Sequence, residues 1–146
     1  MGKAALYSLI GCSLLCMAYA AGFDTFFFEP TIKKDIADHH FFVSEPKDLT
    51  VHVNMTAMFT CSVGNKKGLV AWVKTTGPKD RTILSLDNSV IVGDSRLMIG
   101  SRVGGRDYDL IVFGVTRADE GFYTCFVSAG GQDPPIVSAS ALLTVI

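Results

Sequence analysis

The sequence lacks the patterns that most catalytic and metal-binding sites require. It has no Gly-x-Ser-x-Gly turn before a helix, and its glycine-rich stretch 100–105 opens no helix that could hold a phosphate. Its three histidines, His39, His40 and His52, do not have the spacing of zinc ligands. We therefore predict that the protein is not an enzyme and holds no metal and no cofactor.

The chain also lacks an excess of charge of one sign. It has 13 Lys and Arg against 14 Asp and Glu, and the first 20 residues hold one Lys and no acid, so the remainder carries 12 − 14 = −2. A nucleic-acid-binding protein needs a basic face, so nucleic acid is not expected as a partner. After residue 20, no apolar run reaches the about 20 residues of a membrane-spanning helix, and we predict no direct membrane span.

The N-terminus has the pattern of a secretory signal peptide. Lys3 precedes an uncharged, mostly apolar stretch, 4–17, and Ala18-Tyr19-Ala20 places small residues at alternating positions. The alternative, a membrane anchor, is disfavoured because the apolar run is short. We predict cleavage after residue 20 and a secreted or extracellular mature chain, which reaches the cell surface if a longer form carries an anchor.

Cysteine is scarce as well, and its distribution is informative. Cys12 and Cys16 belong to the predicted signal peptide, so the mature chain keeps Cys61 and Cys125. Two cysteines in an oxidising compartment predict one disulfide. Free thiols or a metal site are the alternatives, and a metal site would need further ligands.

The mature sequence favours an all-β fold. Residues 21–42 form an aromatic-rich leader without clear periodicity, and residues 43–146 form one domain. Short β-rich runs separated by turn residues recur through that domain without a persuasive helix. About nine antiparallel strands are predicted, at 49–53, 57–61, 69–74, 82–86, 90–92, 97–99, 108–112, 122–127 and 136–146.

The cysteines stand in a recognisable constellation. Trp72 follows Cys61 by 11 residues, and Tyr123 lies two residues before Cys125. This pattern is typical of an immunoglobulin β-sandwich, in which two sheets are joined by a disulfide that packs on the indole. The two extra runs between the Trp strand and Asp94 are typical of the variable type.

Several segments narrow this resemblance. The chain resembles the first immunoglobulin domain of the IgLON, lachesin and Dpr/DIP cell-surface proteins, nematode members included. The resemblance is carried by the segments 70–74, 82–86, 93–97 and 108–112 and by the motif 119–125 that follows them. The resemblance spans about 44–146.

The resemblance implies a role in neuronal recognition and cell adhesion. Members of that group are secreted or lipid-anchored, and they pair through the first domain with themselves or with relatives. We therefore expect immunoglobulin-superfamily cell-surface proteins, including a second copy of this chain, as partners. The sequence stops where the first domain of these proteins stops, which leaves a short secreted form and a partial sequence both open.

Two predictions concern structure and modification. The resemblance places Arg96 and Asp119 in an ion pair at the bottom of the sandwich, next to Gly121, and implies a structural role for all three. Asn54-Met55-Thr56 is a glycosylation sequon in a predicted bend between strands, and the alternative is an unmodified turn asparagine.

A partner-binding face follows from strand alternation. If Trp72 points inward, Ala71 and Val73 point outward, and Phe126 does so if Cys125 points inward. The resemblance favours Ile83 outward and Leu84 inward. An outer sheet face with Ala71, Val73, Ile83 and Phe126 is apolar where polar residues are expected, which indicates a partner.

Four alternatives to this face remain. The aromatic leader could cover it, or its residues could be ordinary exposed hydrophobic side chains. An immune-type or soluble ligand-binding protein would use its end loops instead, among them 132–135 and 87–88. A purely structural module of a longer protein would bind through neither.

Overall fold

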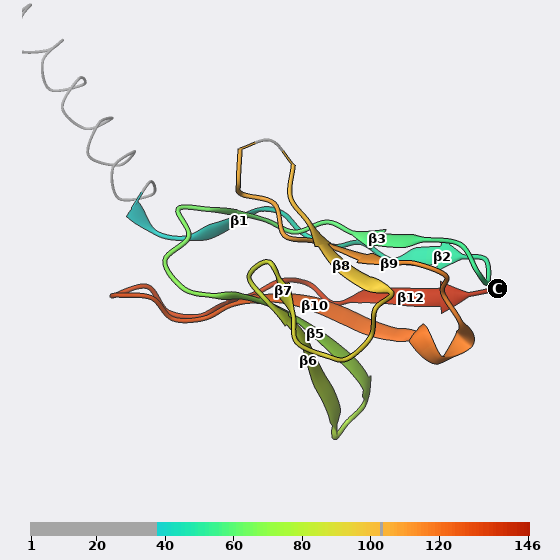
Figure 1. Ribbon diagram of the computed structural model, residues 1–146. Coiled ribbons are helices and arrows are strands. Elements are labelled where there is room, and N and C mark those ends of the chain that lie inside the picture. The colour runs from blue at the N-terminus through green and yellow to red at the C-terminus, as the bar shows by residue number, and fades with distance from the viewer. Residues whose placement is uncertain (1–37, 103) are drawn as a thin grey trace, which may run out of the picture. The chain divides into compact units, whose positions relative to one another are not determined.

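The computed structural model describes residues 38–102 and 104–146, which form two β-layers packed face to face (Figure 1). The all-β expectation is confirmed, and the one helical element described is a single 3-10 turn, η1 (Arg117–Asp119). The predicted signal peptide, 1–20, lies outside the described residues, as does the predicted leader except for 38–42.

One layer is a seven-stranded sheet. Its neighbours run β2-β12-β10-β5-β6-β7, and β11 pairs with β10. All pairs are antiparallel except β2 with β12. The strands are β2 (Leu49–Val51), β5 (Val70–Gly77), β6 (Asp80–Leu86), β7 (Ser89–Val90), β10 (Gly121–Val127), β11 (Ile136–Val137) and β12 (Ala141–Val145).

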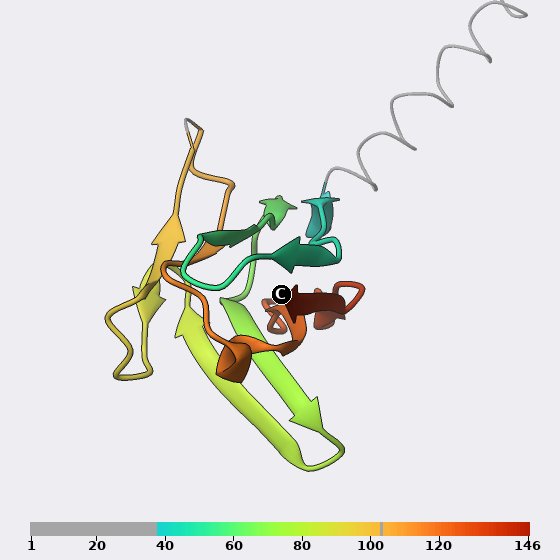
Figure 2. The ribbon, with the colours of Figure 1, turned by 90° about the vertical axis from the view of Figure 1, so that its right-hand side faces the viewer.

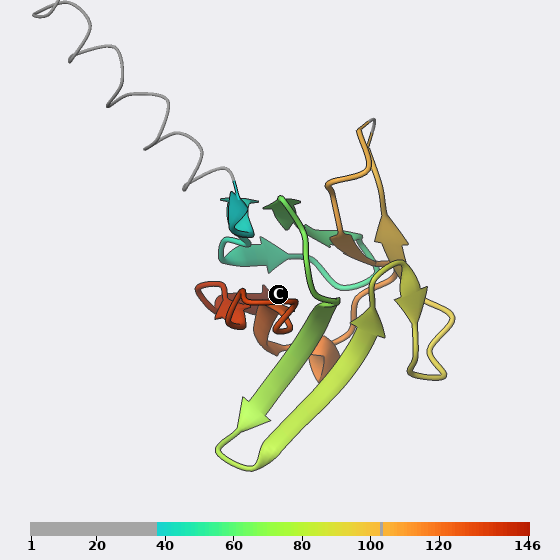
Figure 3. The same ribbon diagram turned by 90° about the vertical axis from the view of Figure 1, so that its left-hand side faces the viewer.

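The other layer contains a three-stranded sheet, β3-β9-β8, and the pair β1-β4. Figures 2 and 3 show the hairpin of β5 and β6 extending away from these strands. The strands of this layer are β1 (Phe41–Ser44), β3 (Ala57–Phe59), β4 (Ser62–Gly64), β8 (Leu97–Gly100) and β9 (Asp109–Val112).

The first strand begins inside the segment that the sequence analysis assigned to the leader. Phe41 and Phe42 form the first half of β1, where they pair with Gly64 and Val63 of β4. The phenyl ring of Phe42 packs on the core. Alternation over only four residues is too short to stand out from an aromatic-rich sequence, which explains why the pattern did not reveal this strand.

The core has the predicted arrangement. Cys61 and Cys125 form a disulfide across the two layers, and both are fully buried. The buried Trp72 donates its indole N–H to the carbonyl of Tyr108 at 2.6 Å. Phe59 lies between the Trp72 and Tyr123 rings, with centroid distances of 6.1 and 4.7 Å. Aromatic packing on a cross-sheet disulfide therefore holds the layers together.

The last predicted run, 136–146, is interrupted. It forms β11 and β12, and the Ser138 hydroxyl between them accepts a hydrogen bond from the Cys125 amide at 2.9 Å. Side-chain hydrogen bonds of serine to the backbone compete with the strand ladder, which accounts for the break. Within residues 38–102 and 104–146, no helix has the length and apolar character needed to cross a bilayer.

Candidate functional site

The outer side of the seven-stranded sheet carries an apolar row that crosses four strands. In register, Leu86 of β6 pairs with Ala71 of β5, Ala71 with Phe126 of β10, and Phe126 with Val137 of β11. A sheet face that meets water normally carries polar side chains at such positions. Here Leu86 is 38% and Val137 59% exposed, so the row presents carbon atoms to solvent.

A second row lies beside the first. Ile83 of β6 pairs with Val73 of β5, and Val73 with Thr124 of β10, whose hydroxyl lies 2.9 Å from that of Ser140. Ile83 is 50% exposed, whereas Leu84 is 6% exposed. The structure thus places both residues on the sides of the sheet that the resemblance favoured.

A β-bulge brings these two rows onto one face. The register shifts between Trp72 and Val73, because Trp72 pairs with Ser85 while Val73 pairs with Ile83, so Leu84 is the extra residue. Strict alternation would send Ile83 and Leu86, three residues apart, to opposite faces. The extra residue instead leaves both outward and sends Leu84 and Ser85 inward.

Residues of both rows, without Val137 and Thr124, line an open groove of about 400 Å³, which we call the outer groove. All four predicted partner residues lie in it, although Ala71 is 5% exposed and forms its floor. Larger neighbours on both sides cover its methyl group, which alternation alone cannot reveal. The groove is lined by Leu69, Ala71, Val73, Arg81, Ile83, Leu86, Phe126 and Ser128.

The sequence analysis missed several groove residues. Leu86 was missed because of the bulge. Leu69 lay within the predicted strand 69–74, in alternation with Ala71 and Val73, and that pattern was available to find it. Arg81 is the one cation that lines the groove, and it has no ion pair among the described residues. Arg81 lies two residues before Ile83 on β6, so alternation would have placed it on the same face, but the predicted strand began only at residue 82.

The loop 132–135 beside this face is held by the N-terminal segment. Asp133 accepts hydrogen bonds from the His39 ring and from the His40 amide, both at 2.8 Å. The His40 ring Nε2 lies 2.6 Å from the Pro134 carbonyl oxygen, to which it donates. The hydrogen bonds from His39 and His40 hold the pKa of the Asp133 carboxyl below its ordinary value. Three hydrogen bonds from His39 and His40 therefore hold the loop at Asp133 and Pro134.

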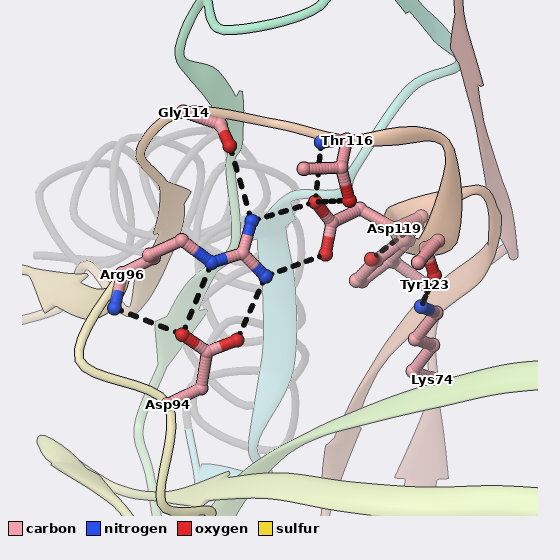
Figure 4. Close-up of polar contacts among 8 residues, drawn as sticks. Lys74, Asp94, Arg96, Gly114, Thr116, Asp119 and Tyr123 are labelled. Atoms are coloured by element: carbon pink, nitrogen blue, oxygen red, sulfur yellow. Dashed lines mark hydrogen bonds and ion pairs between the residues drawn. The ribbon is translucent and has the colours of Figure 1, made fainter.

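The predicted ion pair closes the opposite end of the sandwich (Figure 4). The Arg96 guanidinium donates to both carboxylate oxygens of Asp119, at 2.8 and 3.0 Å. It also donates to both oxygens of Asp94, at 3.2 and 2.8 Å, and to the Gly114 carbonyl at 3.1 Å. The sequence analysis missed Asp94, although its place two residues before Arg96 is suited to such a contact.

This network shifts the pKa values of its members. The hydrogen bonds that Arg96 donates to Asp119 and, next in importance, to Asp94 raise the pKa of its guanidinium above the usual range. Burial on its own raises the pKa of the Asp119 carboxyl, but hydrogen bonds from Arg96 and from the Thr116 amide outweigh it, so the pKa is lowered. A hydrogen bond from Arg96 likewise lowers the pKa of Asp94. The three groups are therefore charged at neutral pH and bind one another.

A tyrosine corner lies next to this network. The Tyr123 hydroxyl donates to the Asp119 carbonyl at 2.6 Å, and burial raises the pKa of the phenol above its usual range. Gly121 has φ = +148°, and a Cβ there would lie 3.1 Å from the Thr75 carbonyl oxygen. Glycine is thus required by conformation and by space. These contacts are structural, since none of them reaches the outer groove.

Sequence comparison agrees with this geometry. The family model of the immunoglobulin I-set domain matches residues 40–145. This chain belongs to the immunoglobulin I-set family. The sequence analysis favoured the variable type because of the runs that form β6 and β7, and both strands are present at the sheet edge.

Two curated proteins are similar to this I-set chain. It is 34% identical over 106 residues to the synaptogenesis protein syg-1 of Caenorhabditis elegans, which covers 71% of the chain and 14% of that protein. It is 33% identical over 106 residues to the irregular chiasm C-roughest protein of Drosophila melanogaster, covering 72% of the chain and 13% of that protein. The chain therefore spans about one seventh of the length of these relatives.

Solved structures share the fold. The first immunoglobulin domain of Dpr1, crystallised bound to that of DIP-eta, superposes with a TM-score of 0.63 at 22% identity, covering 75% of this chain and 98% of that one. A chain from the complex of Dpr2 with DIP-Theta superposes with a TM-score of 0.63 at 25% identity, and the match covers 74% of this chain and 47% of that one.

Proposed function

We propose that this I-set domain is an extracellular recognition and adhesion module that pairs with another immunoglobulin domain through the outer groove. The observation that carries the proposal is the apolar row Leu86, Ala71, Phe126 and Val137, which crosses four strands and exposes Leu86 and Val137 to solvent. Contiguous exposed apolar surface on a soluble domain usually marks a binding site.

The compartment supports this role. A cross-sheet disulfide forms and persists in oxidising, extracellular environments, and Cys61 and Cys125 form one. The relatives are named for synapse formation and for an irregular chiasm, and solved neighbours are complexes between immunoglobulin domains. Those properties belong to the relatives, and we infer the same class of activity here, with immunoglobulin-superfamily proteins or a second copy as partners.

The opposite face is a weaker candidate. Met58, Ile111 and Met98 also form a row across β3, β9 and β8. The depression beside that row is lined by Arg102 and Asp109, which form an ion pair at 3.2 Å. A partner docking there would cover two charges that already satisfy each other and so gain no new ion pair, whereas Arg81 in the outer groove can pair with a carboxylate of the partner.

The test is a binding assay on multivalent surfaces, because a single contact of this kind is weak and gains strength through avidity. The domain is displayed on beads and exposed to itself and to immunoglobulin ectodomains of the same organism. Ile83→Asp and Phe126→Asp are expected to abolish every interaction found with the wild type while the melting temperature is retained.

A matched control comes from the other layer. Met98→Asp introduces the same charge at a side chain that is 46% exposed, compared with 50% for Ile83, and is expected to bind like the wild type. Normal binding by Ile83→Asp would show that the groove is not the site. Loss of binding only in variants of 132–135 would instead indicate recognition by end loops, as in antibodies.

A further inference from the structure

The turn between β2 and β3 presents a side-chain amide that the sandwich does not use. Asn54 is exposed, and its backbone N–H donates to the Val115 carbonyl at 2.8 Å. Its side chain makes no hydrogen bond to any of the described residues. Thr56, two residues on, is also exposed. The acceptor amide and the hydroxyl of the sequon therefore both face solvent on an ordered turn.

An asparagine at position 54 has two possible explanations, the backbone conformation of the turn and its role as an acceptor of an oligosaccharide. Asn54 has φ = +71°, in the left-handed region that asparagine tolerates better than most residues. That requirement explains Asn54 but places no demand on residue 56. Because the turn does not require a hydroxyl at Thr56, the two explanations can be separated by changing Thr56 alone.

The turn carries two exposed apolar side chains. The Val53 amide donates to the Ile146 carbonyl at 3.0 Å, and Figure 1 shows β2 and β12 ending beside the C-terminus. Val53 and Met55 are 41% and 60% exposed. A hydrophilic group on Asn54 would cover these two side chains. None of these residues lines the outer groove, which would remain open.

We propose that Asn54 carries an N-linked oligosaccharide, which covers the exposed apolar side chains of Val53 and Met55. The disulfide gives independent support, because it indicates the same oxidising secretory compartment in which such transfer takes place. The donor is a lipid diphosphate-linked oligosaccharide. Asn54 Nδ2 bonds to C1 of the first sugar, the C1–O bond to the diphosphate breaks, the lipid diphosphate leaves, and the displaced amide proton passes to a base.

The experiment translates the full chain behind a known cleavable signal in the presence of endoplasmic-reticulum microsomes and examines the protease-protected fraction. Protection reports import independently of modification. The wild type is expected to migrate as one glycosylated species, and peptide N-glycosidase should remove the sugar and convert residue 54 to aspartate, which a mass spectrum locates.

Three variants complete the test. Thr56→Ser keeps a hydroxyl and should be modified, whereas Thr56→Ala should be imported without the mass shift. Asn54→Asp keeps a residue that tolerates the positive φ and should also lose the shift. An imported wild type with the mass of the bare chain would overturn the proposal, as would an unchanged shift in Thr56→Ala.

Discussion

Val73 on β5 and Ile83 on β6 lie opposite each other on the outer side of the sheet, although Leu86 shares that side. Leu84 is the extra residue that makes this possible, and its side chain enters the core at 6% exposure. The bulge therefore assigns opposite roles to two leucines that are two residues apart.

This assignment gives the first prediction. Leu84→Ala should lower the free energy of unfolding by about 2–5 kcal/mol, the usual cost of truncating a buried leucine. Leu86→Ala should change it by less than about 1 kcal/mol, because its side chain is partly in water already. Urea unfolding of the two variants measures both values.

The same pair of positions separates stability from recognition. Leu86→Asp should retain the fold and lose binding in the multivalent assay. A Leu86→Ala variant as unstable as Leu84→Ala would contradict the register described here.

Much of this architecture follows from residue spacing, and the bulge shows where such reasoning ends. The two cysteines, Trp72 and Tyr123 predict the sandwich because a disulfide core needs those groups at those separations. The ion pair of Arg96 with Asp119 follows only from resemblance. The burial of Ala71 and the outward direction of Leu86 depend on neighbouring strands and on one inserted residue. Alternation within a single strand contains neither kind of information.

The second prediction concerns acid. The pKa values of Asp94 and Asp119 are lower in the folded chain than their ordinary value of about 4. A carboxyl whose pKa is depressed by folding contributes stability that is complete above its unfolded pKa and is lost as the pH falls through its folded pKa. The melting temperature should therefore fall steeply below about pH 4.

Replacing one carboxylate tests the origin of that fall. Asp119→Asn should lower stability at pH 7 by about 2–4 kcal/mol, somewhat less than the loss from a fully buried pair, because the Arg96 side chain is 35% exposed and keeps Asp94. The melting temperature of this variant should also fall less steeply with decreasing pH than that of the wild type. Thermal melts of both proteins between pH 7 and pH 2 measure the two effects, and parallel pH profiles would exclude Asp119 as a contributor.

The third prediction concerns the disulfide. The cysteines are 64 positions apart, and closing so long a loop restricts the unfolded chain by about 4 kcal/mol in the entropic treatment. Cys61→Ala combined with Cys125→Ala should therefore lower stability by about 2–5 kcal/mol. Denaturant unfolding followed by the fluorescence of Trp72, the one tryptophan in the sequence, reports directly on this core. Equal midpoints for the two proteins would contradict the expectation.

The fourth prediction concerns Gly121. Gly121→Ala should destabilise the domain by about 1–3 kcal/mol, because the new methyl group meets the Thr75 carbonyl at a φ of +148°. Gly93→Ala is the control, since a Cβ at Gly93 meets nothing within 4 Å and its φ is not positive. Calorimetric melting of the two variants should differ clearly, and equal melting temperatures would refute the strain argument.

The bonds from His39 and His40 to Asp133 join positions separated by 94 and 93 residues. A truncation of the N-terminus just before β1 will therefore alter the distant loop 132–135. A chain that begins at Phe41 would lack the two donors to the Asp133 carboxylate, so the loop 132–135 would lose its hydrogen bonds to the N-terminal segment. Chains compared in binding assays should begin before His39. Otherwise a change in partner choice caused by the truncation could be attributed to the sequence of the loop 132–135.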